Sequence, residues 1–277
     1  MELFIRSLNS NQDYKSCVAL QKETWGENFN ECVPPALLMI AQKLSGVAAG
    51  AFDKNNRMLG FVFGLTGLKD GELVNWSHML AVKAEVRGQN IGKQLKLYQR
   101  ELLLKQNIKK VFWTYEPLVA RNAHLNLNKL GARIVEYVAE MYVDDTGSDL
   151  HGGIGMDRFI VEWALEDNRV KEIISGKFTS PQNIYENYPV ANTEVKEKNE
   201  PAPLEKPLPE TPAVRIEIPH NLEAIQNASL ELAATWRAVT RKAFLWYFDK
   251  GFSVAAFYRN PETNRCFYVL TNSEKTV

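Results

Sequence analysis

The chain contains 277 residues, of which 45% are hydrophobic and 24% are charged, as in ordinary soluble globular proteins. This length can form one large domain or two smaller ones, each with its own core. Lysine plus arginine and aspartate plus glutamate both number 33. That balance disfavours a general binder of nucleic acid or anionic membranes, since such proteins usually carry a basic excess.

The three cysteines, Cys17, Cys32 and Cys266, lie far apart. They form no close pair of the zinc-binding kind and no disulfide framework, so we expect plain thiols in a reducing compartment. The N-terminal segment lacks the basic start and apolar run of a secretion signal. No apolar stretch approaches the roughly 18 residues that cross a bilayer. We therefore expect a cytoplasmic protein with no metal site and no nucleic-acid or membrane partner.

Short apolar runs alternate with amphipathic segments from residue 3 to residue 165. The pattern predicts strands at residues 3–8, 47–52, 59–65, 72–82, 111–115, 132–142 and 158–165, and helices at 11–25, 34–44, 90–106 and 121–130. Strands that pair as hairpins, followed by a strand–helix–strand unit over residues 72–115, predict a mixed sheet with helices packed on it.

The composition changes at residue 177. Residues 177–212 hold seven of the twelve prolines, which predicts an extended, weakly structured connector, because proline fixes φ and removes a backbone donor. Beyond it we expect a strand at 214–218, a helix around Leu232–Trp246 that ends at Gly251, and a hairpin over 252–259 and 266–270. The expected domains are therefore residues 1–176, the connector 177–212 and a small α+β subdomain over 213–277.

The segment VRGQNIGKQLKLYQRE, residues 86–101, predicts a glycine-containing loop and then an amphipathic helix. An apolar face formed by Ile91, Leu95, Tyr98 and Leu102 is expected to pack on the sheet, with Lys93, Lys96 and Arg100 toward solvent. Small residues at the helix start leave room for a phosphate near the free backbone N–H groups, where the helix dipole adds positive charge.

Arg87 and Lys93 can add full charges to such a phosphate site. A plain strand-to-helix turn that needs glycine for its φ angles is the alternative interpretation. The loop lacks the Gly-Lys-Ser/Thr ending of a nucleotide P-loop, and it lacks the setting of a dinucleotide fingerprint.

The longer segment HMLAVKAEVRGQNIGKQLKLYQRE, residues 78–101, resembles motif A of the GCN5-related N-acetyltransferase (GNAT) superfamily, whose loop reads Arg/Gln-x-x-Gly-x-Gly/Ala. The matching residues are Arg87, Gly88, Gln89, Ile91 and Gly92. Asn90 replaces the usual glycine, and asparagine is the other residue that best tolerates a positive φ. The resemblance implies that the loop amides hold the pyrophosphate of an acyl-coenzyme A. It also implies that backbone groups of Leu80, Ala81 and Val82 pair with the pantetheine arm.

Two further segments, WTYEPLVARNAHLNLNKLGA and DRFIVEWAL, resemble a bacterial group of predicted acyltransferases in that superfamily. The group usually reads Asp-Pro-Leu where this chain has Glu116 before Pro-Leu. The resemblance implies an α+β protein with a mixed, mostly antiparallel sheet flanked by helices. It also implies an N-acyltransferase that uses acetyl-CoA, or succinyl-CoA, and acts on a small amine or amino acid. The C-terminal subdomain has the element order of the opening half of such a fold, and a lid over the acceptor site is the alternative.

Transfer of an acyl group from a thioester to an amine requires a base for the amine and a proton for the leaving thiolate. The resemblance places a base near the middle of the 72–82 strand, where Ser77 and His78 lie, and Glu116 is another candidate. The family's usual tyrosine acid falls at Leu127, so Tyr115 or a water is the substitute.

Asn122 and Asn126 resemble positions that face the cofactor. Each catalytic or binding candidate has an ordinary structural interpretation as well. The missing tyrosine leaves a non-catalytic acyl-CoA sensor or scaffold open, and the proline-rich connector leaves open an interaction protein.

Arg237 and Arg241 lie one helical turn apart and can hold a substrate carboxylate, although a solvated helix face is the favoured interpretation. The protein is expected to be a monomer or a homodimer.

Overall fold

The computed structural model describes residues 2–142, 153–178, 182–195 and 200–272. The chain divides into two compact units. Among the described residues, unit 1 contains 2–113 and 162–171, and unit 2 contains 114–142, 153–161 and the residues from 172 onward. The domain boundaries expected at residues 176 and 213 stay predictions.

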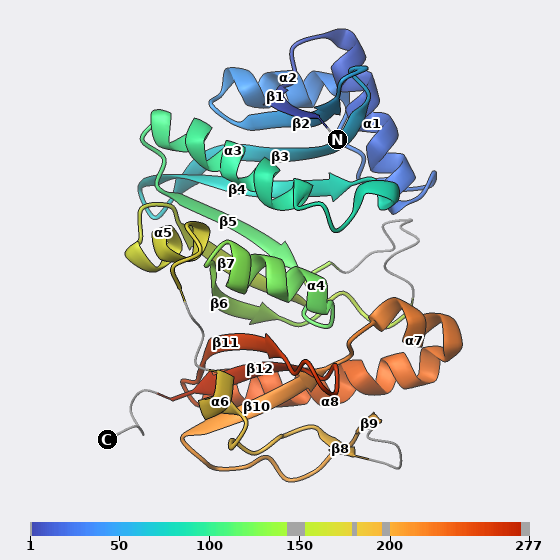
Figure 1. The fold of residues 1–277 in the computed structure, drawn as a ribbon, viewed down its shortest axis with the longest axis vertical. Helices are drawn as coiled ribbons and strands as arrows, with labels where there is room; N and C mark the ends of the chain where they lie inside the picture. The colour runs from blue at the N-terminus through green and yellow to red at the C-terminus, as the bar shows by residue number, and fades with distance from the viewer. Residues whose placement is uncertain (1, 143–152, 179–181, 196–199, 273–277) are drawn as a thin grey trace. The chain divides into compact units, whose positions relative to one another are not determined.

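Unit 1 is built from strands with helices packed on them (Figure 1). Its elements are β1 (Leu3–Ser7), α1 (Asn11–Trp25), α2 (Pro35–Lys43), β2 (Val47–Asp53), β3 (Met58–Lys69), β4 (Glu72–Val82), the short helix η1 (Ala84–Val86) and α3 (Ile91–Lys105). Residues of β5 (Lys110–Tyr115), β7 (Arg158–Ala164) and α5 (Asn168–Ile174) belong to both units.

The strands form a sheet of order β1-β2-β3-β4-β5-β7-β6, with β6 at Arg133–Val138. Strands β1 to β4 are antiparallel neighbours, and β5 runs parallel to β4. The expected α+β class and the mixed, mostly antiparallel sheet flanked by helices are therefore confirmed.

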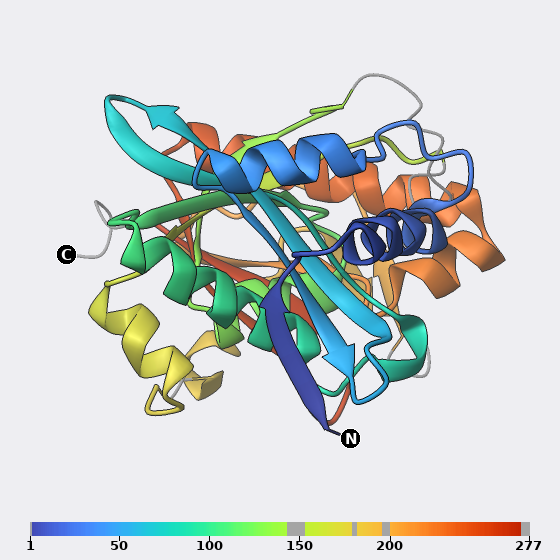
Figure 2. The ribbon, with the colours of Figure 1, turned by 90° about the horizontal axis from the view of Figure 1, so that it is seen from above.

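The helices of unit 1 cover both faces of its strands (Figure 2). Helices α1 and α2 lie on one face, here called the α1/α2 face, and α3 lies on the other, the α3 face. Helix α1 begins at a capping box in which Ser10 and Asp13 each accept a hydrogen bond from the other's backbone N–H. A hydrophobic core fills the α1/α2 face, and its buried members include Leu20, Phe29, Leu38, Phe61, Phe63, Met79 and Ala81.

The hairpin of β3 and β4 is longer than the sequence prediction. Strand β3 was expected to end at Leu65, but the pairing continues to Lys69 opposite Glu72. Asp70 and Gly71 connect the strands with φ values of 52° and 81°. Two central residues with positive φ are typical of the tight hairpin turn that Asp-Gly favours, so the signal for the longer hairpin was present in the sequence.

Two other expected elements differ in unit 2. The helix expected at 121–130 is a short α-helix, α4 (Ala120–Ala123), followed by the π-helical turn η2 (His124–Lys129), in which the N–H of Leu130 bonds the carbonyl of Leu125. The strand expected at 132–142 ends at Val138. Glu140 takes a φ of 47° and its N–H donates to Asp157, so the backbone turns away from the sheet there.

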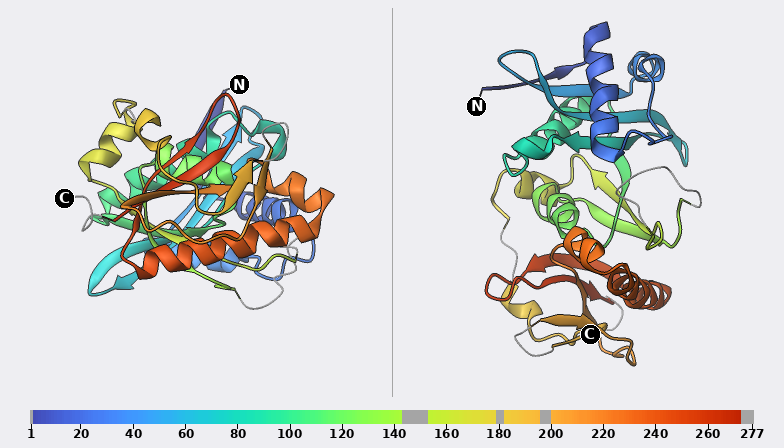
Figure 3. Two further views of the ribbon diagram at one scale, coloured as in Figure 1. Left: turned by 90° about the horizontal axis from the view of Figure 1, so that it is seen from below. Right: turned by 90° about the vertical axis from the view of Figure 1, so that its right-hand side faces the viewer.

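The rest of unit 2 is a three-stranded antiparallel sheet with a long helix along it (Figure 3). Its elements are β10 (Ala213–Ile218), α7 (Leu222–Ala228), α8 (Leu230–Asp249), β11 (Ser253–Arg259) and β12 (Cys266–Thr271). Helix α7 was not predicted. The strand order is β10-β12-β11, so β10 and β11, the first two strands of this sheet along the chain, are not paired. In unit 1 the first two strands, β1 and β2, pair directly. No helix in the described parts of either unit is long and apolar enough to cross a membrane.

The proline-rich connector is more ordered than its composition predicts. It contains α6 (Gln182–Tyr185), β8 (Thr193–Val195) and β9 (Pro201–Pro203). The N–H of Ala191 bonds the carbonyl of Arg215 at 2.9 Å, and the N–H of Arg215 bonds the carbonyl of Pro189 at 2.8 Å. Asn192 is buried and exchanges two hydrogen bonds with the backbone of Glu217. These bonds attach the connector to β10.

Candidate functional site

The loop between β4 and α3 leaves the start of α3 open. Gly88 and Asn90 both take the left-handed conformation, with φ values of 83° and 60°. Asn90 is the N-cap of α3, yet its side chain makes no capping hydrogen bond. Because the first N–H groups of a helix have no partner inside the helix, those of α3 are not satisfied by the cap and remain available to a ligand.

The space around this loop suits a phosphate group. A Cβ atom built on Gly88 would meet no atom within 4 Å. Arg87 and Gln89 are exposed, and Gly92 and Lys93 are half-buried in the first turn of α3. Ile91 is buried and anchors the start of the helix. The residues expected to bind a pyrophosphate therefore lie together in the loop and in the first turn of α3, an arrangement that suits an anion.

Strand β4 leads into this loop. Its pairing with β5 covers Val74–Trp76, while its pairing with β3 continues to Val82. In the described structure, the expected pantetheine-binding residues Leu80, Ala81 and Val82 therefore pair with β3 only. Ala81 is buried on the α1/α2 face, and Leu80 and Val82 are half-buried.

A β-bulge interrupts β4 at Ser77 and His78. Phe63 pairs with Met79 and Leu65 pairs with Trp76, so the two bulge residues stand opposite the single residue Gly64. A bulge bends the strand and changes the direction of its side chains. Ser77 bonds residues of α3, whereas Met79, two positions later, lies in the α1/α2 core. The bulge thus reverses the alternation of side chains along β4.

The two base candidates on β4 lie in different surroundings. Ser77 is buried on the α3 face, where its hydroxyl donates to Gln99 Oε1 at 3.2 Å and accepts from Lys96 Nζ at 2.9 Å. His78 packs edge-on to Phe63, with 6.2 Å between the ring centres. Desolvation lowers the pKa of His78, and the negative charge of Glu31 opposes this. A lowered pKa favours the uncharged imidazole, which can accept a proton.

Lys96 corrects the expectation that it points to solvent. Its side chain is buried on the α3 face, along with Ile91, Leu95 and Gln99. Its Nζ donates to Ser77 Oγ and, at 2.8 Å, to Gln99 Oε1, and it lies 3.9 Å from the centre of the Trp113 ring. Burial lowers the pKa of Lys96 well below its ordinary value. Because Lys96 and Gln99 are polar, the spacing of apolar residues did not identify them as part of the buried face of α3.

Glu116, in unit 2, is held in an ion cluster. Its carboxylate accepts from Arg237 Nη2 at 2.5 Å and from Arg158 Nη1 at 3.3 Å, and one oxygen accepts from the N–H of Leu118. Arg241 bonds Asp157 in the same unit. The solvated face expected for Arg237 is therefore wrong, since this side chain is only 4% exposed.

Tyr115 and the candidates on α4 and η2 also lie in unit 2. Burial raises the pKa of Tyr115, whose hydroxyl lies 3.1 Å from that of Tyr268. Asn122 is half-buried, and Asn126 and Leu127 are buried. A phenol with a raised pKa is a weak proton donor, so the burial of Tyr115 gives no support to its role as the general acid.

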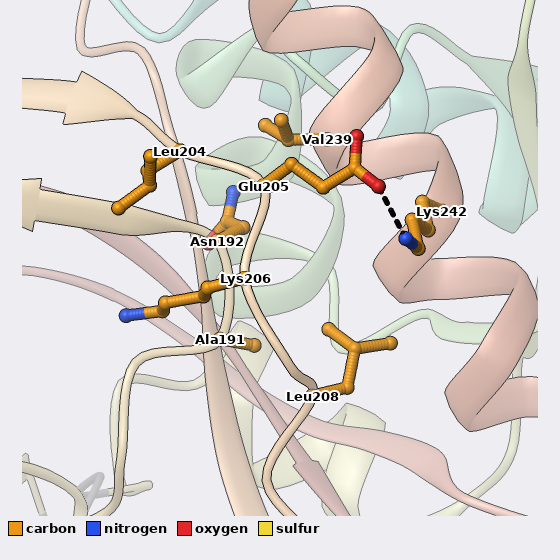
Figure 4. Close-up of a pocket in the computed structure, with 8 residues that line it drawn as sticks. All are labelled: Ala191, Asn192, Leu204, Glu205, Lys206, Leu208, Val239 and Lys242. Atoms are coloured by element: carbon orange, nitrogen blue, oxygen red, sulfur yellow. Dashed lines mark hydrogen bonds and ion pairs between the residues drawn. The ribbon is translucent and has the colours of Figure 1, made fainter.

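A small pocket in unit 2 lies between the connector and α8 (Figure 4). Glu205 and Lys242 form an ion pair at its rim. The pocket has room for about one water molecule, which is far less than a small-molecule ligand needs. No group of three or more potential metal ligands occurs among the described residues.

No protein-family model and no curated protein matches the sequence. Solved structures that match the chain include the ribosomal-protein-S18-alanine N-acetyltransferase from Escherichia coli, with 15% identity, coverage of 60% of this chain and 96% of that chain, and a TM-score of 0.45. An acetyltransferase of the GNAT family from Streptococcus pneumoniae matches with 15% identity, coverage of 58% and 98%, and a TM-score of 0.46.

Naa50 from Arabidopsis thaliana, solved in complex with a bisubstrate analogue containing CoA, matches with 15% identity, coverage of 58% and 98%, and a TM-score of 0.44. At these identities and TM-scores the similarity concerns the fold, and it assigns no substrate and no site residue to this chain.

Proposed function

We propose that this chain is a GNAT-type N-acyltransferase that moves an acetyl or succinyl group from coenzyme A to a small amine or amino acid. The observation that carries the proposal is the uncapped N-terminus of α3, which follows a loop with Gly88 and Asn90 in the left-handed conformation. Such a loop presents backbone N–H groups to an anion and adds the positive end of the helix dipole.

The residues of the loop divide the binding of the pyrophosphate between them. Backbone amides of residues 88–92 hold the phosphate oxygens, and Arg87 and Lys93 supply positive charge. The backbone of Leu80, Ala81 and Val82 pairs with the pantetheine arm, beyond the end of the β4–β5 pairing. When bound, the acyl-CoA supplies a thioester that an amine can attack.

His78 is the base that this geometry supports best. The amine must be neutral to attack, and the lowered pKa of His78 keeps its imidazole free to take the amine's proton at neutral pH. Ser77 is engaged by Lys96 and Gln99, and Glu116 is engaged by two arginines. Direct transfer needs only positioning and proton transfer, without a covalent enzyme intermediate.

Calorimetry with acetyl-CoA and succinyl-CoA tests the cofactor site. Asn90→Val should weaken binding of the preferred thioester, because a β-branched residue strains a left-handed position by roughly 1–2 kcal/mol. Asn90→Gly should retain binding. Asn107→Val is the matched control, since Asn107 has a φ of 59° just beyond the other end of α3. Lack of binding of either thioester to the unmodified protein would reject the proposal.

A non-catalytic acyl-CoA sensor or scaffold is the second candidate. It is favoured by the buried, apolar Leu127 at the position of the usual acid and by the burial of Tyr115. Release of free CoA thiol during a screen of small amines and amino acids separates the two functions. Turnover with any of these amines supports the enzyme, and tight thioester binding without turnover supports the sensor. Cytoplasmic location and a monomeric or homodimeric state stay predictions.

A further inference from the structure

Lys96 is a buried basic residue whose side chain contacts no carboxylate in the described structure. Its partners are Ser77 Oγ, Gln99 Oε1 and the rings of Trp113 and Trp163, whose centres lie 3.9 and 5.6 Å from Nζ. Its residue exposure is 2%. Burial of a charge without an opposite charge is unfavourable, and an apolar side chain of similar volume is often more stable there. Stability alone therefore does not account for a lysine at this position.

Lys96 begins a chain of hydrogen bonds under the bulge of β4. Lys96 and Ser77 both donate to Gln99 Oε1, and Gln99 Nε2 donates to Asn75 Oδ1 at 3.0 Å. Gly64, the residue opposite the bulge, permits this approach, since a Cβ built there would lie 2.5 Å from Asn75 Oδ1. The bonds hold Asn75 and Ser77 on the α3 face, directly before the reversal of β4.

We infer that Lys96 is a positioning residue that holds the β4 bulge through Ser77 and thereby sets the place of the His78 ring on the opposite face. Ser77 and His78 are consecutive and together form the bulge, so the bonds to Ser77 restrict the backbone that carries His78. The catalytic consequence rests on the proposed function, because it requires His78 to act as the base. The positional claim concerns residues of this chain alone.

Nuclear magnetic resonance of the labelled full-length protein tests the positional claim without turnover. The His78 ring signal is assigned by its loss in His78→Gln. Lys96→Met should shift that signal and leave the other histidine signals in place. Lys105→Met is the matched control, because it makes the same change at an exposed position of α3. An unchanged His78 signal in Lys96→Met would overturn the inference.

A double-mutant cycle tests whether the effect passes through Ser77. Ser77→Ala alone should shift the His78 signal, and Lys96→Met should add little to it, since residues that act through one network are not additive. A shift in Lys96→Met that is unchanged on the Ser77→Ala background would contradict transmission through Ser77. Ser77→Ala also supplies a test if Lys96→Met does not fold.

Kinetics and thermal unfolding separate a positioning role from a structural one. Lys96→Met should lower kcat by about tenfold or more with little change in the KM for acyl-CoA, the pattern of a lost interaction in the transition state. Its midpoint of unfolding should be equal to or above that of the unmodified protein. A kcat that falls only in proportion to stability, or does not fall, opposes the inference. If the unmodified protein binds no acyl-CoA, the proposed function fails while the resonance experiment still decides the position of His78.

Discussion

Ser77 and His78 are neighbours in the sequence, but they occupy different chemical environments. Ser77 lies among the polar side chains of α3, and His78 contacts the aromatic ring of Phe63. A serine with its hydroxyl bonded on both sides is a poor candidate for holding a catalytic water. An imidazole with a lowered pKa is a base that works at neutral pH.

The pKa of His78 predicts the pH dependence of turnover. Because desolvation lowers this pKa, the acid limb of kcat/KM should fall at a pH below about 6.5, the ordinary value for histidine. Glu31 raises the pKa of His78 by its negative charge, so Glu31→Gln should move the limb to still lower pH. Glu27→Gln, in the same loop, is the control and should leave the limb in place. If the acid limb of kcat/KM stays at the same pH in Glu31→Gln, His78 is not the group that titrates.

The two elements on either side of the candidate loop, β4 and α3, were accurately predicted. The sequence pattern placed β4 at its observed bounds and α3 within one residue at each end. Asn90, which replaces the usual glycine of the resembling loop, takes a φ of 60°, a value that asparagine tolerates. The predicted buried face of α3 was wrong in part, because it left out Lys96 and Gln99. These residues are polar, and their burial depends on partners from β4 and β5. Such tertiary partners are not visible in the periodicity of one helix.

The bulge of β4 was beyond sequence prediction for a related reason. A bulge is defined by two strands together, since it requires two residues of β4 opposite Gly64 of β3. The residues Ser77 and His78 have no local signature for it. The candidate loop was therefore predictable from the sequence, whereas the arrangement of Ser77 and His78 required the structure.

Strand β3 offers a direct test of the close packing at the bulge. Gly64→Ala should destabilise the protein by about 1–3 kcal/mol, because its Cβ would lie 2.5 Å from Asn75 Oδ1 and 3.0 Å from Gln99 Nε2. Gly67→Ala is the control on the same strand, where a Cβ meets no atom within 4 Å. Urea denaturation measures both changes. Equal effects at the two positions would show that the packing around Gly64 relaxes freely.

At the scale of the whole chain, ion pairs within unit 2 connect residues that lie far apart in the sequence. Glu116 and Arg237 are separated by 121 positions, and Asp157 and Arg241 by 84. Burial would raise the pKa of Asp157, but the bonds from Arg241 and Tyr137 outweigh this and lower it. The sequence balance of 33 basic and 33 acidic residues showed nothing of this pairing, which depends on the fold.

The ion cluster around Glu116 predicts a loss of stability when this residue is changed. Glu116→Gln should destabilise the protein by about 1–3 kcal/mol, because it removes a carboxylate that pairs with the buried Arg158 and Arg237, while Arg237 keeps its pair with Asp157. Glu205→Gln is the control. It breaks an exposed pair with Lys242 in the same unit and should cost less than about 1 kcal/mol. Chemical denaturation measures both, and a small effect at Glu116 would mean that water replaces its carboxylate.

The bulge in β4 also has a consequence for how this strand can change in evolution. Strand β4 holds one residue more than its pairing with β3 requires, so the alternation of its side chains between the two faces reverses at Ser77 and His78. Deletion of either residue would restore a regular strand in which Trp76 still pairs with Leu65 and Met79 still pairs with Phe63. Met79 would therefore keep its place in the core on the α1/α2 face, because paired residues of an antiparallel sheet point to the same face. The extra residue can therefore be lost without a change in the core register, and the loss would alter only the local geometry at Ser77 and His78.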